Sequence, residues 1–385
     1  MTLYASVGPE LAWYGVDVEQ CTLTKQDSVL LLGNVQEAWP HPSNRYLYVA
    51  WSNGGPSFGG TAPPPAGDNH GITTFRIDPA SGALEPHGTP VPIPSRPIHI
   101  TVDIPGEHVL TAYNNPSGIT VHRIQPDGTV GSEVRQLAPL DVGVYAHQVR
   151  VVLSNQSVIL VTRGNAPTAT RPEDPGALKL FDYKDGVLAN RASIAPGGGF
   201  GFQSRHVDFH PSGPWVFLSL EEQNKLQVYK RLPGEALTSE PLFTKDTLPN
   251  GNQPRHALGT VHVHPAGRVV YVANRASGTT EFEGKPVHAG GENSIAVFRI
   301  DQDSGEPSLL QTIDTRGFSP RTFAVDPSGR VLVVANQTAL PTRDGKIVPA
   351  SLSVFRINDE GTLDFVRKYD AETGPGRSLF WTGIV

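Results

Sequence analysis

Residues Arg205 to Lys230 read RHVDFHPSGPWVFLSLEEQNKLQVYK, and this stretch decides the fold. Its alternating and apolar runs predict three short strands, at Arg205–Phe209, Trp215–Leu220 and Lys225–Lys230. The Pro and Gly residues between the first two runs signal a tight turn. The stretch therefore predicts three short strands in succession.

The same unit recurs along the chain. Its other copies are AWPHPSNRYLYVAWSN from Ala38, RPIHITVDIPGEHVLTAYN from Arg96, the weaker AHQVRVVLSNQSVILVTRGN from Ala146, VHVHPAGRVVYVANRASG from Val261 and RTFAVDPSGRVLVVANQ from Arg321. A repeat of roughly 50–60 residues, each with about four short strands, predicts an all-β propeller.

The two ends of the chain supply one more blade. The C-terminal RSLFWTGIV predicts a lone inner strand, and the N-terminal TLYASVGP, WYGVDVEQCTL and DSVLLLGNV predict the outer strands beside it. We expect the N-terminal strands to end near Glu37. The six repeats and this closing blade predict a single seven-bladed β-propeller domain over residues 1–385, with no open sheet edge around the ring.

Composition narrows the class of protein. The chain has 385 residues, and its 40 Gly and 35 Pro fit many turns, because apolar runs recur throughout. A formal charge of −6 argues against a nucleic-acid partner, and no apolar run is long enough to span a membrane. Its start lacks a signal-peptide pattern, and Cys21 is the single cysteine. We therefore expect a cytoplasmic monomer that needs no cofactor.

Four blades carry an insertion at the same connection, between their second and third strands. The insertions are NGGPSFGGTAPPPAGDNHG in blade one, NAPTATRPEDPGA in blade three, ASGTTEFEGKPVHAGGEN in blade five and TALPTRDGKIVP in blade six. In a propeller this connection opens on the same face as the blade-to-blade loops. Because function usually lies on loops held by a rigid scaffold, we expect the working site on that face, at the mouth of the central channel.

A column of polar residues follows the second strand of each repeat. Ten residues after the turn position, the copies give Ser52, Asn114, Gly164 (beside Arg163), Glu221, Arg275 and Gln337. The residue type varies around the ring, which favours a site assembled from several blades over a repeated structural role.

The entrances to the inner strands are polar as well. They carry Arg96, His147, Arg205, Arg321 and Arg377. Arginine suits carboxylate or phosphate recognition, and a histidine can exchange protons near neutral pH. Some of these arginines are expected to bond neighbouring carbonyl groups instead.

The repeats PSNRYLYVAWSN, HPSGPWVFLSLEE, HPAGRVVYVANR and DPSGRVLVVANQ resemble the seven-bladed lactonase family. That family includes propeller-type 6-phosphogluconolactonases and fungal 3-carboxy-cis,cis-muconate lactonizing enzymes. The resemblance covers almost the whole chain. It implies a catalytic set of His147 in VYAHQVR, Arg205 in QSRHVDFHP, Glu221 in LSLEEQN (or Glu222 after a one-residue gap) and Arg275 in VANRASG.

These residues suggest metal-independent hydrolysis of a sugar-acid lactone, of the 6-phosphogluconolactonase kind. Either Glu221 or His147 would act as the general base and the other as the acid, with Arg205 and Arg275 holding the substrate anion or the oxyanion. Further substrate-binding residues are expected at Asn114, Arg96, His206, Gln337 and Arg321. The partner would be a small lactone or polycarboxylate.

Three alternatives remain open. The same groups would suit a carboxymuconate-type cycloisomerase, and a propeller can also serve as a binding platform without catalysis. A metal site is the third, because His262 and His264 lie two apart on one strand, with His99, His206 and His210 on other inner strands. The His-Pro pair of His210 and His264 also occurs at His41, which indicates a structural turn, and we predict no metal.

Overall fold

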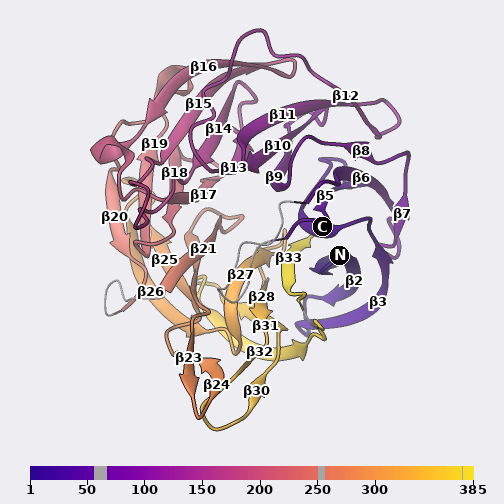
Figure 1. The fold of residues 1–385 in the computed structure, drawn as a ribbon, viewed down its shortest axis with the longest axis vertical. Helices are drawn as coiled ribbons and strands as arrows, with labels where there is room; N and C mark the ends of the chain where they lie inside the picture. The colour runs from indigo at the N-terminus through magenta and orange to yellow at the C-terminus, as the bar shows by residue number, and fades with distance from the viewer. Residues whose placement is uncertain (56–66, 250–255, 375) are drawn as a thin grey trace.

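The structure is a computed structural model that describes residues 1–55, 67–249, 256–374 and 376–385. Its strands form seven main sheets arranged around one axis, as in a propeller (Figure 1). The predicted all-β, seven-bladed fold is confirmed. The prediction of a single domain stays a prediction.

Blades one to three follow the same pattern from the axis outward. Blade one consists of β4 (Asn34–Pro40), β5 (Tyr46–Ser52), β6 (His70–Ile77) and β7 (Leu84–Pro86), with β8 (Val91–Pro92) also on β6. Blade two consists of β9 (Pro97–Val102), β10 (His108–Asn114), β11 (Ser117–Ile124) and β12 (Val130–Glu133). Blade three consists of β13 (Ala146–Val151), β14 (Ser157–Thr162), β15 (Ala177–Lys184) and β16 (Val187–Ile194).

Blades four to six repeat it. Blade four consists of β17 (Ser204–Phe209), β18 (Trp215–Leu220), β19 (Lys225–Lys230) and β20 (Phe243–Asp246). Blade five consists of β21 (His256–Val263), β22 (Val269–Ala276), β25 (Ser294–Ile300) and β26 (Pro307–Asp314). Blade six consists of β27 (Phe318–Val325), β28 (Val331–Thr338), β31 (Ser351–Ile357) and β32 (Leu363–Asp370). Two short 3-10 turns, η1 (Pro196–Gly199) and η2 (Pro233–Glu235), lie between strands.

Blade seven joins both ends of the chain, as predicted. Its inner strand is the C-terminal β33 (Leu379–Ile384), followed outward by β1 (Thr2–Val7), β2 (Glu10–Asp17) and β3 (Thr22–Leu30). Each inner strand packs against the next, and β33 packs against β4, so the ring is closed. One boundary was wrong: the N-terminal strands end at Leu30, and the segment around Glu37 is already the inner strand of blade one.

The core lies between the blades. Seven hydrophobic clusters each join the facing sheets of two neighbouring blades. Buried tyrosines add hydrogen bonds across three of these seams. Tyr48, Tyr271 and Tyr4 each donate to a glycine carbonyl of the next blade, at 2.8–2.9 Å. The last of these, from Tyr4 to Gly82, stabilises the seam where the ring closes.

Two of the four insertions form hairpins. The blade-five insertion folds into β23 (Thr279–Phe282) and β24 (Lys285–His288), and the blade-six insertion into β29 (Leu340–Pro341) and β30 (Ile347–Val348). The two hairpins touch each other, and the Arg343 guanidinium lies over the Phe282 ring at 5.8 Å. Residues 56–66 of the blade-one insertion lie outside the described residues.

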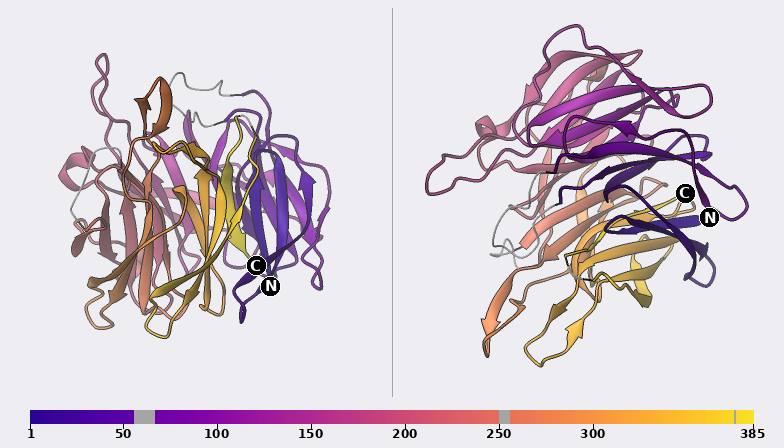
Figure 2. Two further views of the ribbon diagram at one scale, coloured as in Figure 1. Left: turned by 90° about the horizontal axis from the view of Figure 1, so that it is seen from below. Right: turned by 45° about the vertical axis from the view of Figure 1, so that its right-hand side comes forward.

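Both hairpins leave the propeller at one end of its axis. In the left view of Figure 2 the orange β23–β24 hairpin projects at the top, whereas the two chain termini lie at the bottom. This is the end at which second strands finish and inner strands begin. Within the described residues, no helix is long and apolar enough to cross a membrane.

Candidate active site

Antiparallel pairing brings the predicted site residues to the end of the axis that carries the insertions. The first residue of β17, Ser204, pairs with Leu220 at the end of β18, and Ala146 of β13 pairs with Thr162 at the end of β14. A residue that opens an inner strand therefore lies beside a residue that follows a second strand. The polar column and the polar strand entrances consequently meet at one place.

Each inner strand also carries a β-bulge near this end. In every blade the register between the inner and second strands shifts once, which leaves residues of the inner strand unpaired. The unpaired residues are Gln36, Ile98, His147, Arg205, Gly259 with Thr260, Arg321 and Phe380. A bulge re-aims a side chain and is common beside active sites. Three of the predicted site residues therefore occupy equivalent bulge positions.

Glu221, directly after β18, is the centre of a cluster of charges. Its Oε1 lies 3.0 Å from Nη1 of Arg205 and 2.6 Å from Nη2 of Arg275. Its Oε2 lies 2.7 Å from Nε of Arg163. These arginines belong to blades four, five and three respectively, so one carboxylate ties three blades together.

His147 joins the cluster through Arg205. Nη1 of Arg205 donates to Nε2 of His147 at 2.9 Å. Because a guanidinium can only donate, Nε2 must carry the lone pair, which assigns the ring proton to Nδ1. Burial, reinforced by the charge of Arg205, holds the pKa of His147 well below its ordinary value. The imidazole is therefore neutral and has an unprotonated nitrogen in the cluster.

The electrostatics of Glu221 are the opposite of those expected for a proton donor. Burial alone would raise the pKa of its carboxyl group, but the three surrounding guanidinium groups outweigh burial and hold the pKa well below its ordinary value. Burial, together with the charge of Arg275, lowers the pKa of Arg205 to about 10. At neutral pH the cluster consists of an ionised carboxylate, three guanidinium ions and a neutral imidazole.

Arg163 was not among the predicted site residues. It follows β14 directly, as Glu221 follows β18, so it belongs to the polar column. The column count gave the neighbouring Gly164 because the third repeat has no Pro at its turn: Leu153 takes the Pro slot, and ten residues after it is Arg163. Beyond Glu221, Nη2 of Arg163 lies 2.8 Å from Oε1 of Glu222 and 3.3 Å from Oε1 of Gln203.

Three inner-strand entrances hold non-glycine residues in the left-handed region. Tyr145, Gln203 and Ser319 have φ values of 56°, 42° and 57°. Each stands two residues before a bulged residue, in blades three, four and six. Such backbone conformations cost energy and gather at functional sites. Two of the three contact Arg163: its guanidinium lies 5.4 Å from the centre of the Tyr145 ring, and its Nη2 lies 3.3 Å from Oε1 of Gln203.

The other predicted substrate-binding residues divide into two groups. His206 and Arg321 are buried near the axis, and the ring centroid of His206 is 5.1 Å from that of His147 and 5.9 Å from that of His99. Arg321 instead donates to the Phe380 carbonyl at 3.1 Å and lies over the Phe380 ring.

The second group lies at the same end of the axis as the cluster. Gln337 is buried, with its Oε1 3.3 Å from Oγ of Ser319. Asn114 ends β10, and Arg96 precedes β9 with Nε and Nη2 buried and without a hydrogen-bond partner in the described structure. Across residues 1–55, 67–249, 256–374 and 376–385, no hydrogen bond or ion pair links these three residues to Glu221.

The His-Pro histidines have the structural role that their recurrence indicates. Nε2 of His41, His210 and His264 lies 3.1, 2.8 and 2.9 Å from a glycine carbonyl in the turn of the next blade. His262 faces Asp208, with Nδ1 3.6 Å from the carboxylate. Among the described residues, no three His, Cys, Asp or Glu side chains are grouped closely enough to hold a metal ion.

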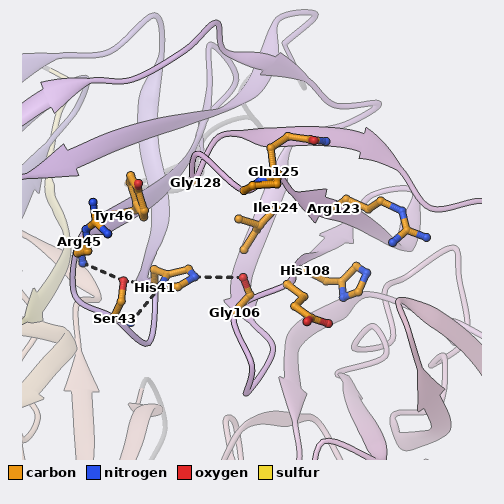
Figure 3. A pocket seen from close by; sticks show the side chains of 12 residues that line it. His41, Ser43, Arg45, Tyr46, Gly106, His108, Arg123, Ile124, Gln125 and Gly128 are labelled. Atoms are coloured by element: carbon orange, nitrogen blue, oxygen red, sulfur yellow. Dashed lines mark hydrogen bonds between the residues drawn. The ribbon is translucent and has the colours of Figure 1, made fainter.

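A surface cavity lies far from the Glu221 cluster, at the opposite end of the axis. It has a volume of about 690 Å³ and lies between the turns of blades one and two, at the end of the axis that carries the termini. Figure 3 shows His41 at its centre, bonded to Ser43 and to the Gly106 carbonyl. A similar groove of about 310 Å³, lined by Arg268 and Glu360, lies between blades five and six. The recurrence marks these grooves as a product of blade packing.

Another cavity lies between the inner strands, at the end of the axis that carries the chain termini. Its volume is about 300 Å³, and Trp39, Phe323 and Trp381 line part of it. Glu37 also lines it, and burial raises the pKa of this carboxyl group. From sequence, Glu37 was predicted only as the boundary of the N-terminal strands.

Comparison with known proteins assigns the chain to a family. Residues 8–369 match the family described as Lactonase, 7-bladed beta-propeller. The chain belongs to this family. The predicted resemblance is thereby confirmed, and the protein is an enzyme of the lactonase family.

Individual relatives agree with this assignment. The lactonase-family chain is 27% identical over 328 residues to a 6-phosphogluconolactonase of Bacillus subtilis, covering 84% of this chain and 83% of the relative. It is 24% identical over 369 residues to a 6-phosphogluconolactonase of Yersinia enterocolitica, covering 94% and 91%.

Solved structures support the fold. A putative 6-phosphogluconolactonase of Bacteroides uniformis superposes with a TM-score of 0.71 at 17% identity, over 99% of this lactonase-family chain and 98% of the other. A periplasmic gluconolactonase of Pseudomonas aeruginosa gives a TM-score of 0.65 at 18% identity, over 98% and 99%.

Proposed function

We propose that the protein hydrolyses a sugar-acid lactone that carries an anionic group, at the cluster of Glu221, His147 and the three arginines. The observation that supports this proposal most strongly is the pairing of a neutral, buried imidazole with several guanidinium groups at one point. Lactone hydrolysis requires a base for the attacking water and donors for the oxyanion. The cluster holds both kinds of group within hydrogen-bonding distance of each other.

His147 suits the role of general base better than Glu221. Its low pKa keeps Nε2 free of a proton at neutral pH, and the one lone pair of that nitrogen accepts from Arg205, which must turn away before Nε2 can take a proton. Both oxygens of Glu221 are engaged by arginines, and protonation of this carboxylate would break three ion pairs. We therefore assign proton transfer to His147 and the orientation of the arginines to Glu221.

The proposed reaction then runs in two steps. Water attacks the lactone carbonyl carbon while Nε2 of His147 takes its proton, and Arg205 shifts its N–H donors to the oxyanion that forms. The tetrahedral intermediate collapses by breaking the bond between the carbonyl carbon and the ring oxygen. The His147 imidazolium returns the proton to that ring oxygen, which leaves as a hydroxyl group while the new carboxylic acid loses its proton.

Charge favours an anionic substrate. Nε and Nη2 of Arg205 are buried without a hydrogen-bond partner in the described structure, as are the same atoms of Arg96. Buried donors of this kind are costly unless a ligand satisfies them, and the planar guanidinium matches a phosphate or a carboxylate. The relatives are 6-phosphogluconolactonases, which agrees with a phosphorylated sugar-acid lactone as the substrate.

A pH-indicator assay of the purified protein tests the proposal. The substrates would be 6-phosphogluconolactone, unphosphorylated gluconolactone and a carboxymuconolactone, each with and without EDTA. We expect acid release that is fastest on the phosphorylated lactone, unaffected by EDTA, and at least about a hundredfold slower in a His147→Gln variant. The absence of acid release from every sugar lactone would refute the proposal. A change in ultraviolet absorbance with carboxymuconate would instead indicate a cycloisomerase.

A further inference from the structure

We propose that Arg163 is a positioning residue for the lactonase reaction: it fixes the orientation of Glu221, and through Glu221 the two arginines that face the substrate. This inference rests on the proposed function, since it concerns the same cluster. It assigns a role to a residue that neither the repeat pattern nor the family resemblance identified.

The first observation is the division of the Glu221 carboxylate. Oε1 accepts from both Arg205 and Arg275, at 3.0 and 2.6 Å, whereas Oε2 faces Arg163 at 2.7 Å. Within the described structure Oε2 has no other ion-pair partner. Without Arg163 the carboxylate would be held on one oxygen, and rotation about its last side-chain bond would move the acceptor away from the other two guanidinium groups.

The second observation is that Arg163 is itself held on several sides. Nη2 contacts Oε1 of Glu222 and Oε1 of Gln203, and the guanidinium lies over the ring of Tyr145. Its side chain is 18% exposed. A guanidinium fixed by a carboxylate, an amide and an aromatic face loses little further freedom when it holds Glu221.

The third observation is where these supports lie in the chain. Tyr145 and Gln203 stand two residues before His147 and Arg205, and both adopt left-handed backbone conformations. Arg163 thus touches the two strand entrances that aim the base and the oxyanion donor. A shift of Arg163 would alter both entrances together, and a misplacement of about 1 Å can cost about a hundredfold in rate.

The residue lies at the base of the blade-three insertion, which packs on the loop leading to Arg205. Asn165 and Asp174 form an isolated β-bridge, and the amide of Gly176 donates to the Gly199 carbonyl at 2.9 Å. The amide of Gly201 also donates to the carboxylate of Glu173. The insertion therefore steadies the site through Arg163 rather than acting only as a surface loop.

Steady-state kinetics of Arg163→Gln, Arg163→Lys and Arg163→Ala on the best lactone substrate test this role. We expect Arg163→Gln to lower kcat about tenfold to a hundredfold with less than about a threefold change in KM. Arg163→Lys should recover part of the loss because it keeps the charge. About 50 mM guanidinium should restore activity to Arg163→Ala, since the cation can occupy the vacated space.

Arg171→Gln is the matched control, because Arg171 is in the same insertion, is 52% exposed and lies 3.9 Å from Asp174. We expect it to behave as the wild type. A purely structural role for Arg163 would lower the melting temperature while leaving kcat per folded molecule unchanged, with no rescue by guanidinium, and that result would overturn the inference.

The two proposals fail in different ways. A wild-type protein that is inactive on every lactone refutes the proposed function, and the positioning role with it. An active wild type whose Arg163→Gln variant keeps its kcat refutes the positioning role alone.

Discussion

Replacing Glu221 with glutamine separates this residue from its neighbour Glu222, two positions that sequence alone could not distinguish. Glutamine keeps the shape of the side chain but has one oxygen. If that oxygen stays with Arg205 and Arg275, the new amide group points its own donors at Nε of Arg163. If the amide flips, it opposes the other two arginines instead. Either orientation leaves buried guanidinium groups facing a donor.

The size of the effect follows from this geometry. Removing one partner of a buried ion pair costs about 3–5 kcal/mol of unfolding free energy. At about 2.1 cal/mol/K per residue, a chain of 385 residues has an unfolding entropy of about 0.8 kcal/mol/K. The melting temperature of Glu221→Gln should therefore fall by about 4–6 °C. Loss of the preorganised arginine donors should lower kcat by about 10²–10³.

Glu222→Gln provides the comparison. The Glu222 side chain is 47% exposed, and an exposed ion pair contributes about 0–1 kcal/mol. The melting temperature should change by about 1 °C or less and kcat by less than about threefold. Differential scanning calorimetry and initial rates on the best lactone would measure both variants. Equal losses in the two variants, or a larger loss in Glu222→Gln, would refute the assignment of Glu221 as the centre of the cluster.

Three further predictions concern the histidines and the closing strand. Because the pKa of His147 is depressed, its protonation should remove activity only at acid pH. The pH profile of kcat/KM should therefore stay flat through pH 6.5. A fall in kcat/KM with its midpoint near pH 6.5 would contradict the neutral imidazole. His264→Ala removes the bond to Gly329, so the melting temperature should fall by about 1–4 °C with kcat within about twofold, and a large loss of kcat would argue for a catalytic histidine there. Truncation after Ser378 removes β33 and should give aggregated protein by size-exclusion chromatography, whereas a stable monomer would contradict ring closure by this strand.

The strands were predictable wherever turn residues flank an apolar run on both sides. Trp215–Leu220 and Lys225–Lys230 were predicted with the bounds of β18 and β19. The strand predicted over the N-terminal run DSVLLLGNV was misplaced because the apolar residues of this run are not all buried. Leu30 and Leu32 are 77% and 66% exposed, and this segment is the end of β3 followed by the connection to β4. Apolar residues on a blade edge and in a blade core look alike in sequence.

The site was only partly predictable for a different reason. The column count and the family resemblance named Glu221 and Arg275, which the structure brings together, and their catalytic roles stay predictions. Nothing in the sequence marks the β-bulges, because a bulge is a register shift between two strands and has no residue type of its own. Arg163 was missed for a different reason: the turn of the third repeat has Leu153 in place of Pro, so the position from which the column is counted was misplaced by one residue.

The location of both chain ends in blade seven sets the order of events during synthesis. Within residues 1–385, β1 to β3 are made before the other strands, and their partner β33 follows more than 370 residues after β1 begins. At about 5–20 residues per second the exposed edge of β1 waits for tens of seconds before it can be covered. For that interval the growing chain carries an unprotected edge that can pair with other chains, so the demand on chaperones should be concentrated before β33 emerges.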